Sequence, residues 1–195
     1  VKHPVKNELP FRNIMYKKVT GEDVLRRSDN GFDYITHQFN SYKNSQVTIA
    51  LIARLKSQRL PLKVLKPFLN DVLFVDLYKK LATSQLASSV YLATSWLPED
   101  APGVAEANKL NLNVFEGHPV SVIDRLLSLA WQEKAAAIIR VTGDNPFTDI
   151  GLIDEMIKLY QQNNLDYVRA NNVPFGVSAE LFSVKYLWNL YLNMD

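Results

Sequence analysis

The segment Ala137-Ile138-Ile139-Arg140-Val141 leads directly into the turn Thr142-Gly143-Asp144-Asn145-Pro146. An apolar, β-branched run that ends in a Gly-Asp-Asn-Pro turn is typical of a strand buried inside a parallel sheet. The apolar residues that follow the turn recur at helical spacing: Ile153, Met156, Ile157 and Tyr160. This strand–turn–helix unit predicts the fold class.

The same alternation of strand and helix extends along the chain from Val47. Short apolar runs predict further strands at 47–52, 90–93, 113–115, 167–168 and 181–182. Helical spacing of apolar residues predicts further helices at 72–82, 104–110, 122–134 and 186–192. Strands that alternate with helices of this length form crossover units, so we expect an α/β fold whose mostly parallel sheet is covered on both faces.

The first 45 residues differ from the rest in pattern. They are polar and rich in turn signals, and their short apolar runs predict two strands and a helical turn. We therefore place a domain boundary near Ser45. Residues 1–45 form an N-terminal extension or the remnant of a preceding small domain, and residues 46–195 form the main domain.

Composition excludes several classes of protein. Of 195 residues, 47% are hydrophobic and 22% are charged, which is ordinary for a globular domain and excludes a disordered chain. A net charge of +2 is too small to indicate nucleic-acid binding. The absence of cysteine excludes disulfides, thiolate nucleophiles and cysteine-ligated metals, and it fits a reducing, cytoplasmic setting. No apolar run reaches the roughly 18 residues needed for a membrane span.

Ligands of such sheets bind beyond the carboxyl ends of the strands, so we expect the functional residues in the segments that follow the strands. The segment after the first predicted strand carries a hydroxyl at Ser57 and five cations within thirteen positions: Arg54, Lys56, Arg59, Lys63 and Lys66. Guanidinium and ammonium groups in a loop with free backbone N–H groups suit phosphate binding. A solvated basic loop is the alternative.

Asp144 is the candidate metal ligand. Gly143 can adopt a backbone conformation closed to other residues, which would project the Asp144 carboxylate from the strand end toward the basic loop. A carboxylate placed there suits Mg²⁺ that also contacts phosphates. The alternative is an Asx-type turn before Pro146. Asp149 is expected to cap the next helix.

Other polar residues receive structural or open interpretations. Thr94 and Ser95, at the end of another predicted strand, could contact a base or ribose, and they could equally start the next turn. The three histidines lack metal-ligand spacing and are expected at the surface: His3, His37 and His118. Trp188 and Tyr191 are three residues apart on a predicted helix, so we expect both in the core.

Four ordered stretches together resemble the cytidylyltransferase family of the spore-coat-polysaccharide and acylneuraminate type. They are Ala53-Arg54-x-x-Ser57-x-Arg59-Leu60-Pro61-x-Lys63-Val64-Leu65, then Ala93-Thr94-Ser95, then Gly117 with Asp124-Arg125, then Arg140-Val-Thr-Gly-Asp-Asn-Pro146 with Asp149. The resemblance runs from about Val47 to Phe182. The first stretch is specific, and the ordered combination is more so.

The resemblance implies a nucleotide-diphospho-sugar transferase fold, a Rossmann-like three-layer α/β/α sandwich. It also implies Mg²⁺-dependent transfer of CMP from CTP to a sugar, with release of pyrophosphate, in polysaccharide biosynthesis; family members are often homodimers. It assigns nucleotide binding to Ala53, Arg54, Ser57, Arg59, Lys63, Ala93, Thr94 and Gly143. Within this set it gives catalytic roles to Arg54 and Lys63, and it makes Asp144 a catalytic residue and the metal ligand.

The sequence also departs from the family pattern. Lys56 and Leu62 replace glycines of the phosphate loop, and Val120-Ser121 replaces an acidic pair. The family also supplies a late metal-binding aspartate, and this sequence ends at Asp195 without one. These departures favour an alternative, a degenerate non-catalytic member that binds a nucleotide or a partner as a scaffold.

Overall fold

The computed structural model describes residues 30–43, 45–55 and 62–193. The strands in these residues are β1 (Val47–Ile52), β2 (Pro67–Phe68), β3 (Asp71–Val72), β4 (Ser89–Ser95), β5 (Val114–Gly117), β6 (Ala137–Thr142), β7 (Tyr167–Arg169) and β8 (Glu180–Ser183). The helices are α2 (Asn30–Ser41), α3 (Leu73–Leu81), α4 (Ala101–Lys109), α5 (Val122–Glu133), α6 (Ile150–Asn163) and α7 (Val184–Asn193), with short 3₁₀ helices η1 (Lys63–Leu65) and η2 (Pro98–Asp100). None of these described helices is long and apolar enough to cross a bilayer.

The main sheet has the strand order β5-β4-β1-β6-β8-β7 within the described residues. β1 pairs in parallel with both β4 and β6, and β5 continues the parallel set, whereas β8 runs antiparallel to β6 and β7. The chain builds β4 and β5 on one side of β1 and then returns to build β6 on the other. The strand order therefore reverses at β1, where β6 is its neighbour.

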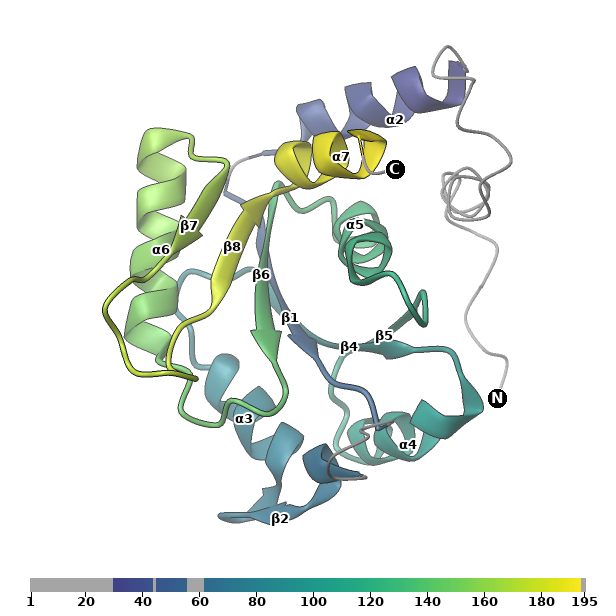
Figure 1. Ribbon diagram of the computed structural model, residues 1–195, viewed down its shortest axis with the longest axis vertical. Helices are drawn as coiled ribbons and strands as arrows, with labels where there is room; N and C mark the ends of the chain where they lie inside the picture. Colours follow the sequence, from purple (N-terminus) through teal and green to yellow (C-terminus); the bar gives the residue numbers. More distant parts are fainter. Residues whose placement is uncertain (1–29, 44, 56–61, 194–195) are drawn as a thin grey trace.

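Helices cover both faces of this sheet (Figure 1). Alternate residues of β1 point to opposite faces of the sheet. Ile49 and Leu51 pack on the face covered by α3, α4 and α6. Ala50 packs on the face covered by α2, α5 and α7. In β6, Ile139 and Ile138 divide in the same way. The predicted three-layer α/β/α sandwich with a mostly parallel sheet is confirmed.

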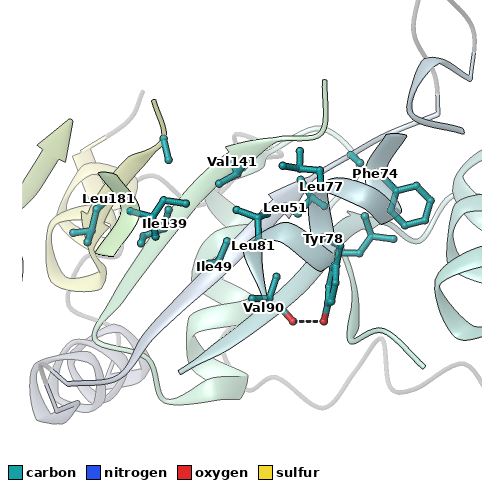
Figure 2. Close-up of a cluster of buried hydrophobic side chains, with 14 of the residues drawn as sticks. Ile49, Leu51, Phe74, Leu77, Tyr78, Leu81, Val90, Ile139, Val141 and Leu181 are labelled. Atoms are coloured by element: carbon teal, nitrogen blue, oxygen red, sulfur yellow. Dashed lines mark hydrogen bonds between the residues drawn. The ribbon is translucent and has the colours of Figure 1, made fainter. Parts of the chain in front are cut away.

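Figure 2 shows the core on the α3 face, where Leu77 and Leu81 lie over Ile49 and Leu51. Tyr78 is also buried there, and its hydroxyl donates a 2.7 Å hydrogen bond to the Val90 carbonyl. Burial raises the pKa of Tyr78, so the phenol stays neutral and keeps its proton for that bond. This core holds α3 against β1 and β4.

The N-terminal part differs from its prediction in the residues that the structure describes. Residues 30–41 form the three-turn helix α2 rather than a single helical turn. Phe39 of α2 is buried and lies edge-on to Trp131, and its ring is 5.5 Å from that of Trp188. Trp188 and Tyr191 are both buried, as predicted. Tertiary packing on α5 and α7 therefore supports a helix that local periodicity did not reveal, while the boundary near Ser45 stays a prediction.

Candidate active site

The candidate site lies at the edge of the sheet where the parallel strands β1, β4, β5 and β6 have their carboxyl ends (Figure 1). Arg54 follows β1, Thr94 lies at the end of β4, and Asp144 follows β6. This edge contains the point where the strand order reverses, which is the usual ligand position in open α/β sheets. Two predicted phosphate ligands, Ser57 and Arg59, lie outside the described residues.

Lys63 and Asp144 meet in this edge region. The Lys63 ammonium, in the first residue of η1, donates a hydrogen bond to Oδ2 of Asp144. The two side chains are 29% and 42% exposed, so a ligand in solvent can reach both. Burial raises the pKa of the Asp144 carboxyl, but the hydrogen bond and charge of Lys63 outweigh this effect and hold the pKa below its ordinary value. The carboxylate is therefore ionised at neutral pH.

Gly143 positions Asp144, but for a different reason from the one predicted. Among the described glycines only Gly176 has a positive φ, so the conformation of Gly143 is not one that excludes other residues. What excludes them is space: a Cβ at this position would lie 2.8 Å from the Ala53 Cβ and 3.2 Å from the Ile52 carbonyl oxygen. The Gly143 N–H also donates a 2.8 Å bond to that carbonyl. Glycine therefore allows the ends of β1 and β6 to stay in contact.

The turn after Gly143 is held by its neighbours. Asn145 donates from its backbone N–H to the Thr142 carbonyl and from its side chain to the Thr142 hydroxyl, at 3.0 and 2.7 Å. Asp149 accepts a 2.9 Å bond from the Leu152 N–H and is the N-cap of α6, as predicted. The carboxylate of Asp144 is thus directed to Lys63 while other side chains secure the turn.

Arg54 points toward the segments that follow β4 and β5. Its Nη1 donates to the Pro119 carbonyl, and its Nε lies 3.4 Å from Oδ2 of Asp100. Its Nη2 lies 3.8 Å from a Glu99 oxygen, and the side chain is 28% exposed. The structure therefore places Arg54 at the same edge as Lys63 and Asp144, although no direct contact joins it to that pair.

Asp100 was not predicted to have a role. Its carboxylate is fully buried and accepts hydrogen bonds from the Ser95 hydroxyl and from the Leu55 N–H, the latter at 2.7 Å. The Ser95 hydroxyl is therefore held inside the protein. Ala93 and Thr94, the predicted base contacts, are also buried at the end of β4. The signal for Asp100 was present, because a carboxylate follows a predicted strand end, but single acidic residues in loops are common.

Arg125 is a second buried charge of this region. Its Nε and Nη2 donate to the His118 carbonyl, and its side chain occupies the space that a Cβ on Gly117 would need. Burial, together with the nearby charge of Arg54, lowers the pKa of Arg125 to about 10. The guanidinium still carries its charge at neutral pH.

The expectation that His118 lies at the surface is wrong, because the residue is buried. Its Nδ1 accepts backbone hydrogen bonds from Val120 and Ser121, at 3.1 and 2.8 Å. The histidine therefore shapes the turn between β5 and α5. His37, on α2, is exposed as expected, and His3 lies outside the described residues.

Leu62 occupies a glycine-like conformation. Its φ of 55° and ψ of 23° lie in the left-handed region, which a residue with a Cβ adopts at a cost. Its N–H lies 3.4 Å from the Leu55 carbonyl oxygen, so residues on either side of the segment 56–61 are close to each other. The left-handed backbone at residue 62 explains why the family pattern has glycine there. This chain keeps the same backbone conformation with leucine in place of glycine.

A cavity of about 460 Å³ opens on the other side of β6, next to Thr142 and Asn145. Its wall includes Arg140, which is paired with Glu180, and the fully exposed ring of Phe175. Burial raises the pKa of Glu180, but the hydrogen bond and charge of Arg140 outweigh it and lower that pKa. The wall is therefore charged and polar, with one aromatic face.

The candidate site offers a single carboxylate toward a cation. Among the described residues no group of three or more His, Cys, Asp or Glu side chains could hold a metal ion. A cation at Asp144 would need further oxygen ligands from water or from a bound phosphate. Such a site suits an ion that arrives with a phosphate ligand.

Comparison with known proteins agrees with this geometry. A family model described as cytidylyltransferase matches residues 48–191. An uncharacterized protein of Methanocaldococcus jannaschii is 35% identical over 141 residues, which are 72% of this chain and 58% of the relative. The spore coat polysaccharide biosynthesis protein SpsF of Bacillus subtilis is 32% identical over 147 residues, 73% of this chain and 61% of the relative. The chain thus spans about three fifths of the length of these curated relatives.

Solved structures show the same fold. A cytidylyltransferase from Leptospira borgpetersenii superposes with a TM-score of 0.71 at 27% identity, over 77% of this chain and 65% of that protein. A CMP:2-keto-3-deoxy-manno-octonic acid synthetase solved with CTP superposes with a TM-score of 0.65 at 15% identity, over 77% of this chain and 79% of that protein. At 15% identity this second likeness concerns the fold alone.

Proposed function

Since this chain belongs to the cytidylyltransferase family, we propose that it transfers CMP from CTP to a sugar hydroxyl and releases pyrophosphate. The observation that carries the proposal is the ion pair of Lys63 and Asp144 at the carboxyl edge of the sheet, the same edge at which Arg54 follows β1. A triphosphate needs cationic side chains for its oxygens, and its metal counter-ion needs a nearby carboxylate. The similarity to SpsF supports a sugar as the acceptor.

The reaction needs little covalent participation from the protein. The oxygen of the sugar hydroxyl bonds to the α-phosphorus of CTP, the bond from that phosphorus to the bridging oxygen breaks, and pyrophosphate leaves. The hydroxyl proton passes to solvent. Negative charge grows on the phosphate oxygens during the displacement, and fixed cations stabilise it. Lys63 and Arg54 are the described residues that would supply this charge.

The family resemblance implies Mg²⁺, and the residues present fit it. Asp144 is ionised and accessible, and one carboxylate with water and phosphate oxygens is a usual ligand set for this ion. When bound, Mg²⁺ would neutralise phosphate charge. Lys63 now holds the carboxylate, so it would have to move from Asp144 to a phosphate when the nucleotide and the ion enter.

The acceptor sugar would bind in the cavity beside β6. The cavity shares Thr142 and Asn145 with the turn that carries Asp144, so an acceptor there would lie next to the reacting phosphate. Amide and hydroxyl groups pair with sugar hydroxyls, and the exposed ring of Phe175 offers a face for the apolar side of a sugar ring. Arg140 and Arg169 in this lining would suit an acidic sugar.

Calorimetric titration with CTP tests the nucleotide part of the proposal. We expect binding that is tighter with Mg²⁺ than without it, and a larger rise of the melting temperature with CTP than with ATP at equal concentration. Equal protection by both nucleotides would contradict the cytidylyl assignment. Release of pyrophosphate from CTP in the presence of acidic keto sugars would then test the transfer.

A second candidate is a non-catalytic scaffold that binds a nucleotide. The strained Leu62 in place of glycine favours it, as does the lack, among the described residues, of a group of three or more side chains that could hold a metal ion. A scaffold would bind CTP without releasing pyrophosphate with any acceptor. The pyrophosphate assay therefore separates the two functions, and the titration alone does not.

A further inference from the structure

Asp100 is a fully buried acid near the candidate site, and its position is unusual for its sequence context. It stands at the N-cap of α4, where an aspartate commonly accepts a hydrogen bond from the first turn of the helix. Its side chain makes no such bond. A buried carboxylate is costly unless its oxygens are satisfied, so the bonds that it does make define its role.

The two oxygens of Asp100 join the ends of two strands. Oδ1 accepts from the Leu55 N–H at 2.7 Å, directly after β1, and Oδ2 accepts from the Ser95 hydroxyl at the end of β4. Leu55 is the last described residue before the segment 56–61, which contains the other predicted phosphate ligands. Asp100 therefore ties the residue that follows Arg54 to the end of β4.

Asp100 also holds the guanidinium of Arg54. Nε of Arg54 lies 3.4 Å from Oδ2, and Nη1 donates to the Pro119 carbonyl. Nη2 of Arg54 lies 3.8 Å from a Glu99 oxygen, a separation that makes an ion pair but is too long for a hydrogen bond. Two nitrogens are thus held by hydrogen bonds to the protein, while Nη2, which has only the longer ion pair with Glu99, could donate a hydrogen bond to a ligand.

We propose that Asp100 is a positioning residue for nucleotide binding: it orients Arg54 so that Nη2 meets the triphosphate of CTP. This inference rests on the proposed function. An arginine held in place before binding loses less conformational freedom when the ligand arrives. The effect of Asp100 on nucleotide affinity is then exerted through Arg54, which distinguishes it from a residue that only stabilises the fold.

A double-mutant cycle tests whether Asp100 acts on CTP affinity through Arg54. CTP is titrated into the whole protein in the presence of Mg²⁺. Asp100→Asn keeps the size of the side chain but turns one acceptor into a donor, and we expect the Kd for CTP to rise at least tenfold. Arg54→Ala should raise it by a similar factor. In the Arg54→Ala background, Asp100→Asn should change the Kd by less than twofold, because its target is gone. Additive effects of the two substitutions would overturn the proposal.

Glu99→Gln is the matched control. It removes a carboxylate of the same 3₁₀ helix that lies near the same guanidinium without a hydrogen bond. We expect a Kd within twofold of the wild type. A tenfold change would mean that affinity follows the net charge near Arg54 rather than its orientation by Asp100, and it would overturn the proposal.

Arg54→Lys tests the same idea without disturbing Asp100, in case Asp100→Asn fails to fold. The substitution keeps the charge, but one ammonium group cannot bond to Asp100, to the Pro119 carbonyl and to a phosphate in the same directions. We expect at least a fivefold rise in the Kd for CTP. Wild-type affinity in Arg54→Lys would overturn the role of Asp100.

The outcomes separate this inference from the proposed function. If the wild-type protein fails to bind CTP, the proposed function fails and the inference with it. If the wild type binds CTP and Arg54→Ala weakens binding, but Asp100→Asn does not, the function stands and the role of Asp100 alone is refuted. All titrations are performed well below the melting temperature of each variant, so that folding does not enter the Kd.

Discussion

Lys63 and Asp144 are 81 residues apart in the sequence, and their side chains form an ion pair at the carboxyl edge of the sheet. Their proximity follows from the topology, because β1 and β6 are adjacent although four strands separate them in the chain order. Each side chain neutralises the other in the absence of a ligand. A phosphate that attracts Lys63 would release Asp144 toward a cation, so the two binding events should be coupled.

Asp144→Asn should abolish the effect of Mg²⁺ on CTP affinity. The amide keeps the shape and one weak oxygen ligand but removes the charge that attracts the ion. Lys63 also loses its partner and is free to meet a phosphate, so binding in the absence of Mg²⁺ should persist. Calorimetric titration of CTP with and without Mg²⁺ measures both effects.

Asp149→Asn is the control for this substitution. Asp149 lies five residues further on, and its carboxylate caps α6 by accepting from Leu152. Asparagine caps helices about as well as aspartate, so the Mg²⁺ dependence should remain. If the two variants behave alike, or if Asp144→Asn keeps the full effect of Mg²⁺, the metal site lies elsewhere.

Lys63→Met should raise the pKa of Asp144. Burial raises that pKa, and the hydrogen bond and charge of Lys63 are the largest of the effects that bring it below its ordinary value. A carboxyl whose pKa is lowered by folding stabilises the protein above the unfolded pKa, and this contribution is lost as the pH falls through the folded pKa. The difference in unfolding free energy between wild type and Lys63→Met should therefore be present at neutral pH and decline below about pH 4.

The size of that difference should be small. Both side chains are partly exposed, and such ion pairs contribute about 1 kcal/mol or less. A ¹³C titration of the Asp144 carboxyl carbon in the two proteins measures the pKa directly. An unchanged titration curve would show that Lys63 does not pair with Asp144 in solution.

The strands and helices could be predicted because burial leaves a periodic trace in the sequence. Ile138 and Ile139 pack on opposite faces of the sheet, so the apolar run around them identified β6. The helix α2 left a weaker trace, since its packing depends on Phe39 contacting two tryptophans far along the chain. Periodicity within one segment cannot reveal a contact of that range.

The residues that organise the candidate site were harder to predict. Asp100 is one acid in a loop, and only the fold shows that its oxygens reach Leu55 and Ser95. His118 was expected at the surface because the histidines lack metal-ligand spacing, yet its ring accepts two backbone hydrogen bonds inside a turn. Gly143 was predicted to position Asp144 through a backbone conformation closed to other residues, whereas the structure shows that glycine is needed because Ala53 lies too close for a side chain. Such a close approach leaves no signature in a single sequence.

Gly143→Ala should destabilise the protein by about 1–3 kcal/mol, the usual cost of forcing a methyl group into a packed site. The new Cβ would lie 2.8 Å from the Ala53 Cβ, so the ends of β1 and β6 would have to separate. Adding Ala53→Gly should recover part of the loss. Urea unfolding of the single and double variants measures both changes.

Gly103→Ala provides the comparison for Gly143→Ala. Gly103 lies in α4, and a Cβ there would meet Leu55 at 3.7 Å, an ordinary van der Waals contact. Alanine favours helix over glycine by about 1 kcal/mol, so this variant should be neutral or more stable. Equal destabilisation by the two alanines would refute the steric explanation for Gly143.

Leu62→Gly should stabilise the protein and tighten CTP binding. The left-handed conformation of Leu62 costs about 1–2 kcal/mol for a residue with a Cβ, and glycine removes that cost. The unfolded chain with glycine also gains about 0.5–1 kcal/mol of conformational freedom, so the net gain in stability should be about 0–1.5 kcal/mol. Leu69, with a φ of 48°, is the matched control because it is strained in the same way in the turn between β2 and β3.

Leu69→Gly should give a similar gain in stability, measured by urea unfolding, and leave the Kd for CTP unchanged. Leu62→Gly should lower the Kd for CTP, since phosphates would approach the backbone at residue 62. If both glycines change CTP binding equally, or if neither does, residue 62 is not part of the phosphate loop.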